Sequence, residues 1–426
     1  MKKLLSCLLA ILSLLAMASS CTNIASQNED KETSERSQHP DIVQLTNPPS
    51  NTDANVSMDT DKYSALVDFC NDIAASLAAE SDGSTNTLSS PLSAYFALAM
   101  VKAGASGKTL DEMNAVMGDI SDVKICSLIS HLTTLNHTTL NIADSVWIDN
   151  TKNFEPKQKY LDTLAEYYLA ECYKAELAVS EGAVNRWIEE HTNGMIKNML
   201  NETALDSALM ALVNTIYMDA QWKKPFDSYA THEREFVNSD GSRALRDFMY
   251  NGNRSEAVIE SDSYIGVVLP YKDGSLKFAA LMSKDDTMSA AAMFELIAED
   301  GGWKAIVETA EDEKIKLYIP SFEQDDALSL NDTLKALGIE LAFSDGADFS
   351  EISNNIKLDS VLQNAVLKLD ENGTEAAAAT VATMVATSAR PVEEVRTIEF
   401  NRPFAFGVFD SDTGAVLFTG EHNIAE

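Results

Sequence analysis

Two short motifs in the chain resemble binding motifs, one for phosphate and one for zinc, and each lacks a residue that its motif requires. Residues 104–109 read GASGKT, but a phosphate-binding loop also needs a glycine at position 102, which is lysine here. Residues 232–236 read HEREF, so Phe236 stands where a zinc-binding helix would carry its second histidine. None of the histidines has a local nucleophile–base context, and no Gly-x-Ser-x-Gly elbow occurs. We therefore expect no enzyme activity, no metal and no cofactor.

A different kind of chemistry is suggested by residues 370–404, DENGTEAAAATVATMVATSARPVEEVRTIEFNRPF. Gly373, two residues after Glu371, gives the backbone the freedom of a hinge. When the following residues are extended, one face carries only small or β-branched side chains: Thr374, Ala376, Ala378, Thr380 and Ala382. Such a chain can enter a closed β-sheet as a new strand, because no bulky or charged side chain has to be buried. A flexible linker or a short alanine helix is the alternative.

Amphipathic helices and apolar strands must position this stretch. Helices are expected over residues 61–79 and over 184–200, where Gly194 interrupts the pattern. Another follows a Ser90 cap with Pro91 in its first turn, and its apolar surface on all sides predicts burial. Strands are expected over residues 140–148, 211–218, 264–271 and 315–320, with two more over 404–420 around a turn. Helices come early and strands late without βαβ alternation, which predicts an α+β domain.

The N-terminus resembles an export signal. Lys2 and Lys3 precede an apolar run over residues 4–15, which is too short for a good membrane span. The following AMASSC favours a lipoprotein signal over residues 1–20 with Cys21 lipidated, and ordinary secretory cleavage after Ala18 is the alternative. Residues 21–60 are polar and acidic, so we expect a disordered tether. Both alternatives place the mature protein outside the cytoplasm, either lipid-anchored at the cell surface or secreted.

Net charge and cysteine content further limit the partners and binding sites that we expect. The formal net charge is −34, and the chain has no basic run that could neutralise phosphates, so nucleic acid is not an expected partner. Cys7 lies in the signal, which leaves Cys70, Cys126 and Cys172 in the folded part. Their odd number and wide spacing favour buried thiols over a disulfide framework or a metal site, although a disulfide between two of them stays open.

Eight motifs in succession carry a family resemblance that covers about residues 61–422. On these motifs the chain is identified as a member of the serpins, the serine protease inhibitors. In chain order they are NTLSSPLSAYFALAMVKAGASGKT, VNRWIEEHTNGMI, LVNTIYMDAQWKKPF, LPYKDGSLKFAALM, IPSFEQDDALSLNDTLKALGIELAF, ADFS, LKLDENGTEAAAAT and FNRPFAFGVFDSDTGAVLFTG.

The resemblance implies one α+β domain over residues 61–426, with a large central β-sheet, two smaller sheets and about eight or nine helices. It also implies an exposed reactive loop over about residues 371–395. In the implied mechanism a serine protease cleaves this loop as a substrate. The cut loop then inserts into the central sheet as a strand and traps the acyl-enzyme. A monomer is expected.

The resemblance also assigns roles to residues. The hinge would comprise Glu371, Gly373, Thr374, Ala376, Ala378 and Thr380. The family spacing of 17 residues, counted inclusively from Glu371, places the reactive bond between Thr387 and Ser388. Arg390 is the rival site, although Pro391 makes its bond a poor one to cleave. The shutter, where the central sheet parts, would comprise Ser90, Ser93, Asn214 and Gln363, and Trp222 would lie at the top of the sheet, where insertion begins. Gln363 replaces the usual histidine, which puts a histidine-linked pH response in doubt.

An inhibitor of elastase-like or subtilisin-like serine proteases is the first reading, because Thr387 suits a shallow specificity pocket. A trypsin-like target is less favoured, since it requires cleavage after Arg390. The alternative function is that of a non-inhibitory serpin that binds a ligand or the matrix. The uniformly small hinge residues favour the inhibitor.

Overall fold

The computed structural model describes residues 42–46, 48, 62–285, 288–374 and 395–425. Several predictions therefore fall outside the described residues: the signal and Cys21, the hinge positions Ala376, Ala378 and Thr380, and the candidate cleavage sites at Thr387, Ser388 and Arg390. In the described ranges, no helix combines the length and apolarity that crossing a membrane requires.

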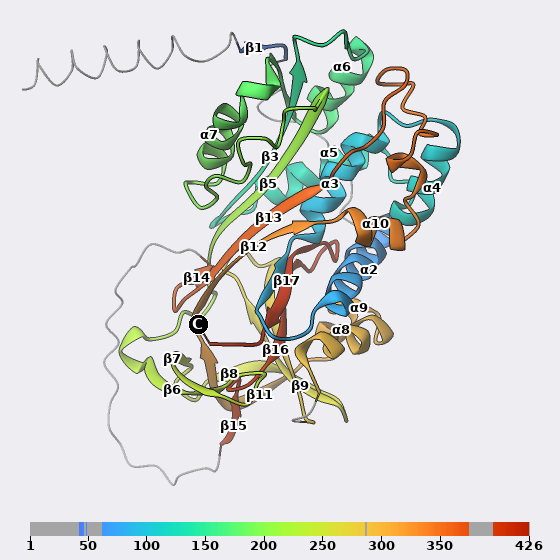
Figure 1. Ribbon diagram of the computed structural model, residues 1–426. Coiled ribbons are helices and arrows are strands. Elements are labelled where there is room, and N and C mark those ends of the chain that lie inside the picture. The colour runs from blue at the N-terminus through green and yellow to red at the C-terminus, as the bar shows by residue number, and fades with distance from the viewer. Residues whose placement is uncertain (1–41, 47, 49–61, 286–287, 375–394, 426) are drawn as a thin grey trace, which may run out of the picture.

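A seven-stranded sheet forms one half of the molecule (Figure 1). Its two longest strands, β3 and β5, pair antiparallel along their length, as the apolar, β-branched runs over 140–148 and 211–218 predict. In spatial order the strands are β1 Val43–Gln44, β4 Glu171–Ala175, β3 Thr138–Asp149, β5 Met210–Gln221, β14 Gly373–Thr374, β13 Leu362–Leu369 and β12 Phe322–Ser329.

The other ten strands form two smaller sheets, as the resemblance implies, which join in one path of nine strands with β15 beside it. Strand β11 joins the two parts, because its first residues pair with β8 and its last residues pair with β7 and β15. The path runs β2 Thr87–Ser89, β17 Val416–His422, β16 Phe404–Asp410, β10 Leu276–Ser283, β9 Tyr264–Pro270, β8 Ser255–Glu260, β11 Glu311–Pro320, β7 Arg243–Tyr250 and β6 His232–Val237, with β15 Arg396–Glu399 beside β11. The strands predicted over 264–271, 315–320 and 404–420 are confirmed.

Nine α-helices occur in the described residues, as the sequence led us to expect. Helix α3 is buried nearly all round, because its apolar surface packs between the two sheets. The helices are α2 Ser64–Glu80, α3 Pro91–Lys102, α4 Gly107–Met117, α5 Asp122–Thr133, α6 Gln158–Tyr167, α7 Glu181–His191, α8 Ala290–Glu299, α9 Gly302–Glu308 and α10 Asn331–Ala336.

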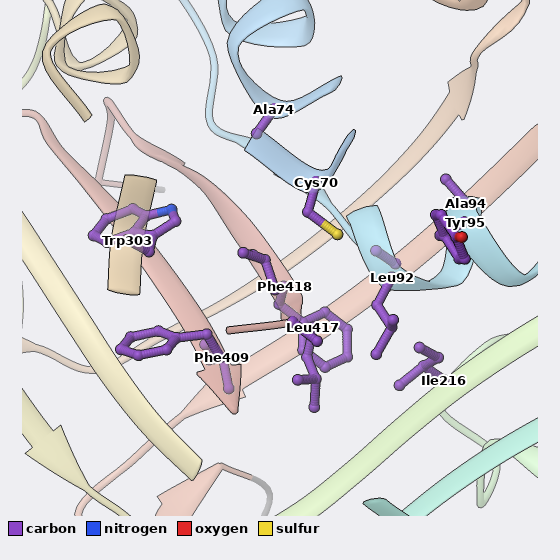
Figure 2. Packing of buried hydrophobic residues seen from close by; sticks show 14 of the residues in the cluster. Cys70, Ala74, Leu92, Ala94, Tyr95, Ile216, Trp303, Phe409, Leu417 and Phe418 are labelled. Atoms are coloured by element: carbon purple, nitrogen blue, oxygen red, sulfur yellow. The ribbon is translucent and has the colours of Figure 1, made fainter. Parts of the chain in front are cut away.

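The main core covers one face of the seven-stranded sheet, and a second cluster beside α7 covers part of the other face. On one face, alternate residues of β5 and β13 such as Ile216 and Leu367 join the main core. Figure 2 shows Leu92 of α3, Leu417 of β17 and Ile216 pointing toward one another in this core. On the opposite face, Val213 packs in a second cluster with Trp187 of α7. A strand added between β5 and β13 would therefore have one face buried in the main core.

Three local predictions need correction. The hydroxyl of Ser90 makes no cap bond to α3, because it donates instead to the carbonyl of Leu417 at 2.6 Å. The helix predicted over 184–200 begins earlier and ends at His191, and Gly194 with its left-handed φ of 81° lies just beyond the end. The tether predicted over 21–60 does not hold for residues 42–46. There Val43–Gln44 pair with β4, and the Leu45 amide donates to the Cys172 carbonyl.

The three cysteines of the folded part, Cys70, Cys126 and Cys172, are buried and are not joined in disulfides. Burial raises the pKa of the Cys70 thiol to about 12, so the group behaves as a small apolar side chain. The HEREF motif lies in strand β6, and GASGKT lies at the start of α4, where residue 107 has a left-handed φ of 53°. Neither motif occupies the structural context that its chemistry would need.

Candidate functional site

Strand β14 enters the seven-stranded sheet at one end, between β5 and β13 (Figure 1). Gly373 pairs with Gln221 and Thr374 pairs with Ala220 on the β5 side, while Thr374 pairs with Leu369 on the β13 side. Beyond Thr374 no ladder joins β5 directly to β13 within the described part of the chain. We call this line between the two strands the seam. Its two edges offer backbone donors and acceptors to an additional strand.

A tight turn leads the chain from β13 into β14. The Asp370 carboxylate accepts hydrogen bonds from the amides of Asn372 at 2.8 Å and Gly373 at 3.3 Å, and the Asp370 amide donates to the Gly373 carbonyl at 2.9 Å. A Cβ atom on Gly373 would lie 1.9 Å from the carbonyl oxygen of Ala220. Only glycine therefore allows the hinge backbone to approach β5 this closely.

Thr374 lies in the interior, with 2% of its surface exposed. Its hydroxyl is 2.6 Å from the hydroxyl of Tyr271, and this hydrogen bond is buried. Burial raises the pKa of Tyr271 well above its ordinary value, so the phenol stays protonated and able to donate. The first residue after the hinge glycine is thus already packed as a core residue.

Trp222 holds the turn from the β5 side. Its indole Nε1 donates to the Asp370 carbonyl at 2.9 Å, and its backbone amide donates to the Asn372 carbonyl at 2.8 Å. Its ring stacks on that of Tyr271 with centroids 4.5 Å apart. Glu371 is also anchored, because its carboxylate accepts a hydrogen bond of 2.6 Å from the Thr231 hydroxyl. The hinge residues Glu371, Gly373 and Thr374 therefore lie at the entrance to the seam.

The predicted shutter residues lie farther along the seam, and they form two hydrogen-bonded sets rather than one. Gln363 of β13 uses both ends of its amide: Oε1 accepts from the Ser90 amide at 2.9 Å, and Nε2 donates to the Ser90 carbonyl at 2.7 Å. Ser90 lies directly before α3. As the sequence suggested, a glutamine can both donate and accept here. One side of the seam is thus bonded to the start of α3.

The second set lies on the β5 side. The Ser93 hydroxyl, from the first turn of α3, donates a short hydrogen bond to Asn214 Oδ1. Asn214 Nδ2 in turn donates to Oδ1 of Asp144 at 2.8 Å, and Asp144 lies opposite Asn214 on β3. The first turn of α3 is therefore bonded to β13 through Ser90 and to β5 through Ser93.

A cavity of about 460 Å³ lies beside the shutter, at the end of the seam far from the hinge. Its lining combines the first residues of β5, the first residues of β13 and the first turns of α3, and includes Ser93, Asn214, Leu212, Val361 and Gln363. A smaller hollow between Ile216–Met218 and Val366–Lys368 lies beside Thr374. Unfilled space thus occurs near both ends of the seam.

Sequence reasoning missed three residues of this site. Tyr271 and Asp370 act through hydrogen bonds to the hinge that no spacing rule reveals. Asp144 stands in an apolar strand pattern, where a buried acid was a visible anomaly, but its partner Asn214 is 70 positions away in the chain. Only the strand pairing brings the two together.

The comparisons with known proteins agree on one family. Residues 64–424 match the family model described as serpin (serine protease inhibitor). Neuroserpin of Gallus gallus is 30% identical over 359 residues, which cover 79% of this chain and 85% of that protein. An uncharacterised serpin-like protein of Thermococcus kodakarensis is 27% identical over 412 residues, covering 89% and 94%.

The solved structures agree as well. The native state of tengpin, a thermophilic serpin, superposes with a TM-score of 0.77 at 29% identity, covering 90% of this chain and all of that one. The α+β fold expected from the sequence, with large sheets and about nine helices, is confirmed. The chain belongs to the serpin family of serine protease inhibitors.

Proposed function

We propose that the chain inhibits serine proteases as a suicide substrate. The protease cleaves the loop that follows Thr374 and forms an acyl-enzyme. The freed loop then continues β14 along the seam and carries the attached protease away before deacylation. The observation that carries this proposal is that β14, Gly373–Thr374, pairs with β5 on one side and with β13 on the other. Beyond Thr374 no ladder joins β5 to β13 in the described residues, so their edges are available to a longer strand.

The register of β14 fixes where each loop residue would lie after insertion. Continuing both antiparallel pairings by two residues places Ala376 between Met218 and Leu367. Two further residues place Ala378 between Ile216 and Ala365. These four neighbours belong to the main core, so only small side chains would fit between them. The small-residue face of the loop thus matches the buried face of the seam.

The same register would place Thr380 between Asn214 and Gln363, the two shutter residues. Its hydroxyl can donate and accept, so it could replace bonds that Asn214 and Gln363 now make to Ser93 and Ser90. We therefore propose that the shutter opens as its hydrogen bonds pass from α3 to the incoming strand.

The free energy of insertion is large enough to drive this movement. About a dozen inserted residues would add roughly ten ladder hydrogen bonds at about 0.5–1.5 kcal/mol each, together with buried apolar surface. The sum is on the order of 10 kcal/mol, which is comparable with the stability of a whole domain.

The target protease is proposed from the loop sequence. Cleavage between Thr387 and Ser388 suits an elastase-like or subtilisin-like enzyme with a shallow specificity pocket. Cleavage after Arg390 would suit a trypsin-like enzyme, but Pro391 follows, and the hinge would be three residues too long. The net charge of −34 would steer basic proteases toward the inhibitor, so added salt should slow association.

We also propose that Cys21 carries lipid and holds the inhibitor at the outer side of a membrane. Growth of an expressing bacterium with a labelled fatty acid tests this. The wild-type chain should carry label and Cys21→Ala should carry none. An unlabelled wild-type chain in the medium would instead support plain secretion.

A denaturing gel tests the proposed function. The protein is mixed with pancreatic elastase, neutrophil elastase, subtilisin or trypsin, and mass spectrometry locates the cut. A covalent band of elastase or subtilisin joined to the inhibitor chain up to Thr387, with residues 388–426 released, is expected. Elastase with its active-site serine chemically blocked is the control and should give no band. Cleavage without a covalent band would contradict inhibition and leave a substrate or a non-inhibitory binding protein.

A further inference from the structure

Asp144 is a buried acid on β3 with 2% of its surface exposed. Its Oδ1 accepts the hydrogen bond from Asn214 Nδ2 at 2.8 Å. Its Oδ2 has no hydrogen-bond partner among the described residues. A buried carboxylate with one bare oxygen is costly in its charged form. While the site stays closed, protonation of Asp144 removes this cost.

Among the residues that the structure describes, no cation offsets the charge of Asp144. Burial raises the pKa of its carboxyl to about 7, and the Asn214 bond only partly opposes this. In the described part of the chain, none of the ionisable or charged groups on the elements around it contributes to the shift. Those groups are Glu171, Cys172, Tyr173 and Lys174 of β4, Tyr217 and Asp219 of β5, Asp122, Lys124, Cys126 and His131 of α5, Tyr95 and Lys102 of α3, and Asp149 of β3 itself.

Asp144 is coupled to the seam through one residue. Asn214 joins it to Ser93 of α3, while Gln363 on the other side of the seam is bonded to Ser90, directly before the same helix. Parting β5 from β13 must therefore break at least one of these sets. Ser93 and Asn214 also line the cavity of about 460 Å³. If β5 moves away from α3, this cavity would widen at Asn214, which carries the bond to Asp144.

We infer that Asp144 is a proton-dependent positioning residue of the shutter, which holds the seam closed when it is protonated and eases opening when it is ionised. This inference rests on the proposed insertion of the loop between β5 and β13. It gives the chain a pH response at the shutter without a histidine, since Gln363 cannot titrate.

The sign follows from the two states of the seam. In the closed state the pKa of Asp144 is about 7, and in an open, hydrated state it would approach the ordinary aspartate value of about 3.9. The closed state therefore binds the proton more tightly, and lowering the pH favours it. Insertion should be fastest above about pH 7 and slow by up to about tenfold per pH unit below it.

Annealing of a loop peptide tests this without the pH dependence of a protease. A labelled peptide of residues 374–387, with Glu375→Gln to remove its own titration, is mixed with the full-length protein between pH 5 and pH 8. The wild-type annealing rate should be at least tenfold, and at most about 100-fold, lower at pH 5 than at pH 8. Asp144→Asn keeps an oxygen acceptor for Asn214 but cannot ionise. It should anneal slowly at every pH, as the wild type does at pH 5.

His131→Gln is the matched control, because His131 on α5 is a second titratable group, whose pKa the neighbouring Asp410 raises above the ordinary value of 6.5. This variant should keep the wild-type profile. If Asp144→Asn fails to fold, Asp144→Ala takes its place with the same flat profile expected. A wild-type profile in either variant, or a flat profile in the wild type, overturns the inference and leaves the inhibitory function standing. Failure of the peptide to anneal at any pH contradicts the insertion mechanism itself, and this inference with it.

Discussion

The hydroxyl groups of Thr374 and Tyr271 lie 2.6 Å apart in the interior, where β14 begins to enter the seam. This contact means that the hinge is already buried in the core at Thr374, which has 2% of its surface exposed. Further insertion would bury the next residues on this face of the loop in the same way, and most of their side chains are smaller than that of Thr374. Substitutions at Thr374 should therefore affect insertion rather than recognition by the protease.

Thr374→Arg should leave the first encounter with elastase unchanged and turn the inhibitor into a substrate. A buried, unpaired guanidinium at this position would cost several kcal/mol, so the cut loop would insert too slowly to trap the acyl-enzyme. The number of inhibitor molecules consumed per protease inhibited is the readout, and it should rise at least tenfold. Thr374→Ser keeps the hydroxyl and should stay within about twofold of wild type. An equally efficient Thr374→Arg variant would rule out insertion at this position.

Gly373→Val should hinder the hinge at its closest approach to β5. The added Cβ would meet the Ala220 carbonyl oxygen at 1.9 Å, and backbone cannot give way as a flexible side chain can. We expect an intact fold by circular dichroism but slower peptide annealing and fewer covalent complexes. Gly182→Ala in α7, where a Cβ meets nothing within 4 Å, is the control and should behave as wild type. Unchanged annealing in Gly373→Val would show that β14 does not start the inserted strand.

Gln363→Met should loosen the shutter, because an apolar side chain of similar size leaves the Ser90 amide buried without a partner and the Ser90 carbonyl with only its bond from the Ala94 amide. Loss of these two bonds should cost about 2–4 kcal/mol of native stability. The expected readouts are a lower melting temperature and faster loss of inhibitory activity on storage. Gln158→Met, at an exposed position of α6, should change neither. If both variants melt alike, the Gln363 bonds do not hold the seam.

The ion pair between His131 and Asp410 should stabilise the fold mainly at mildly acidic pH. The bond to Asp410 raises the pKa of His131. Burial acts to raise the pKa of Asp410, but the bonds from His131 and Thr413 outweigh it and leave that pKa lowered. Because the pKa of His131 is raised in the folded state, its ion pair stabilises the fold fully below about pH 6.5. This stabilisation is lost as the pH rises through the folded-state pKa of His131. Because the pKa of Asp410 is lowered in the folded state, its ionised form stabilises the fold above about pH 3.9. This stabilisation is lost as the pH falls through the folded-state pKa of Asp410.

His131→Gln should therefore reduce stability by on the order of 2 kcal/mol at pH 6 and by much less at pH 9. Denaturant unfolding at the two pH values measures the difference. His232→Gln, at an exposed position of β6, is the control. Equal losses at both pH values would mean that the contact of 3.4 Å between His131 and Asp410 carries no charge-dependent energy.

Sequence patterns predicted the apolar parts of the fold well. The runs over 140–148 and 211–218 became β3 and β5, because β-branched residues in a continuous run suit a sheet that is buried on both faces. The end of α7 and the short strand β1 escaped prediction. Strand β1 depends on a contact with distant residues, the pairing of Val43 with Lys174, whereas α7 ends in a local turn in which the Gly194 amide donates to the Glu189 carbonyl.

The site was predictable only in part. The hinge and shutter residues were named from motifs, and Glu371, Gly373, Thr374, Gln363 and Asn214 do lie along one seam. Their bonding was not predictable, since Ser90 was expected to cap a helix and instead holds Gln363 and Leu417. The role of Asp144 could not be inferred before strand pairing placed it opposite Asn214.

The melting temperature of the cleaved protein compared with the intact one is the most direct test. Cleavage within residues 375–394 by a protease that is not trapped should let the loop complete the sheet. Because a gain on the order of 10 kcal/mol is spread over a domain of this size, the melting temperature should rise by roughly 10–20 °C, with extra protected backbone amides along β5 and β13. Identical melting of the two forms, with no amides gained, would contradict the claim that the intact fold waits to add a strand.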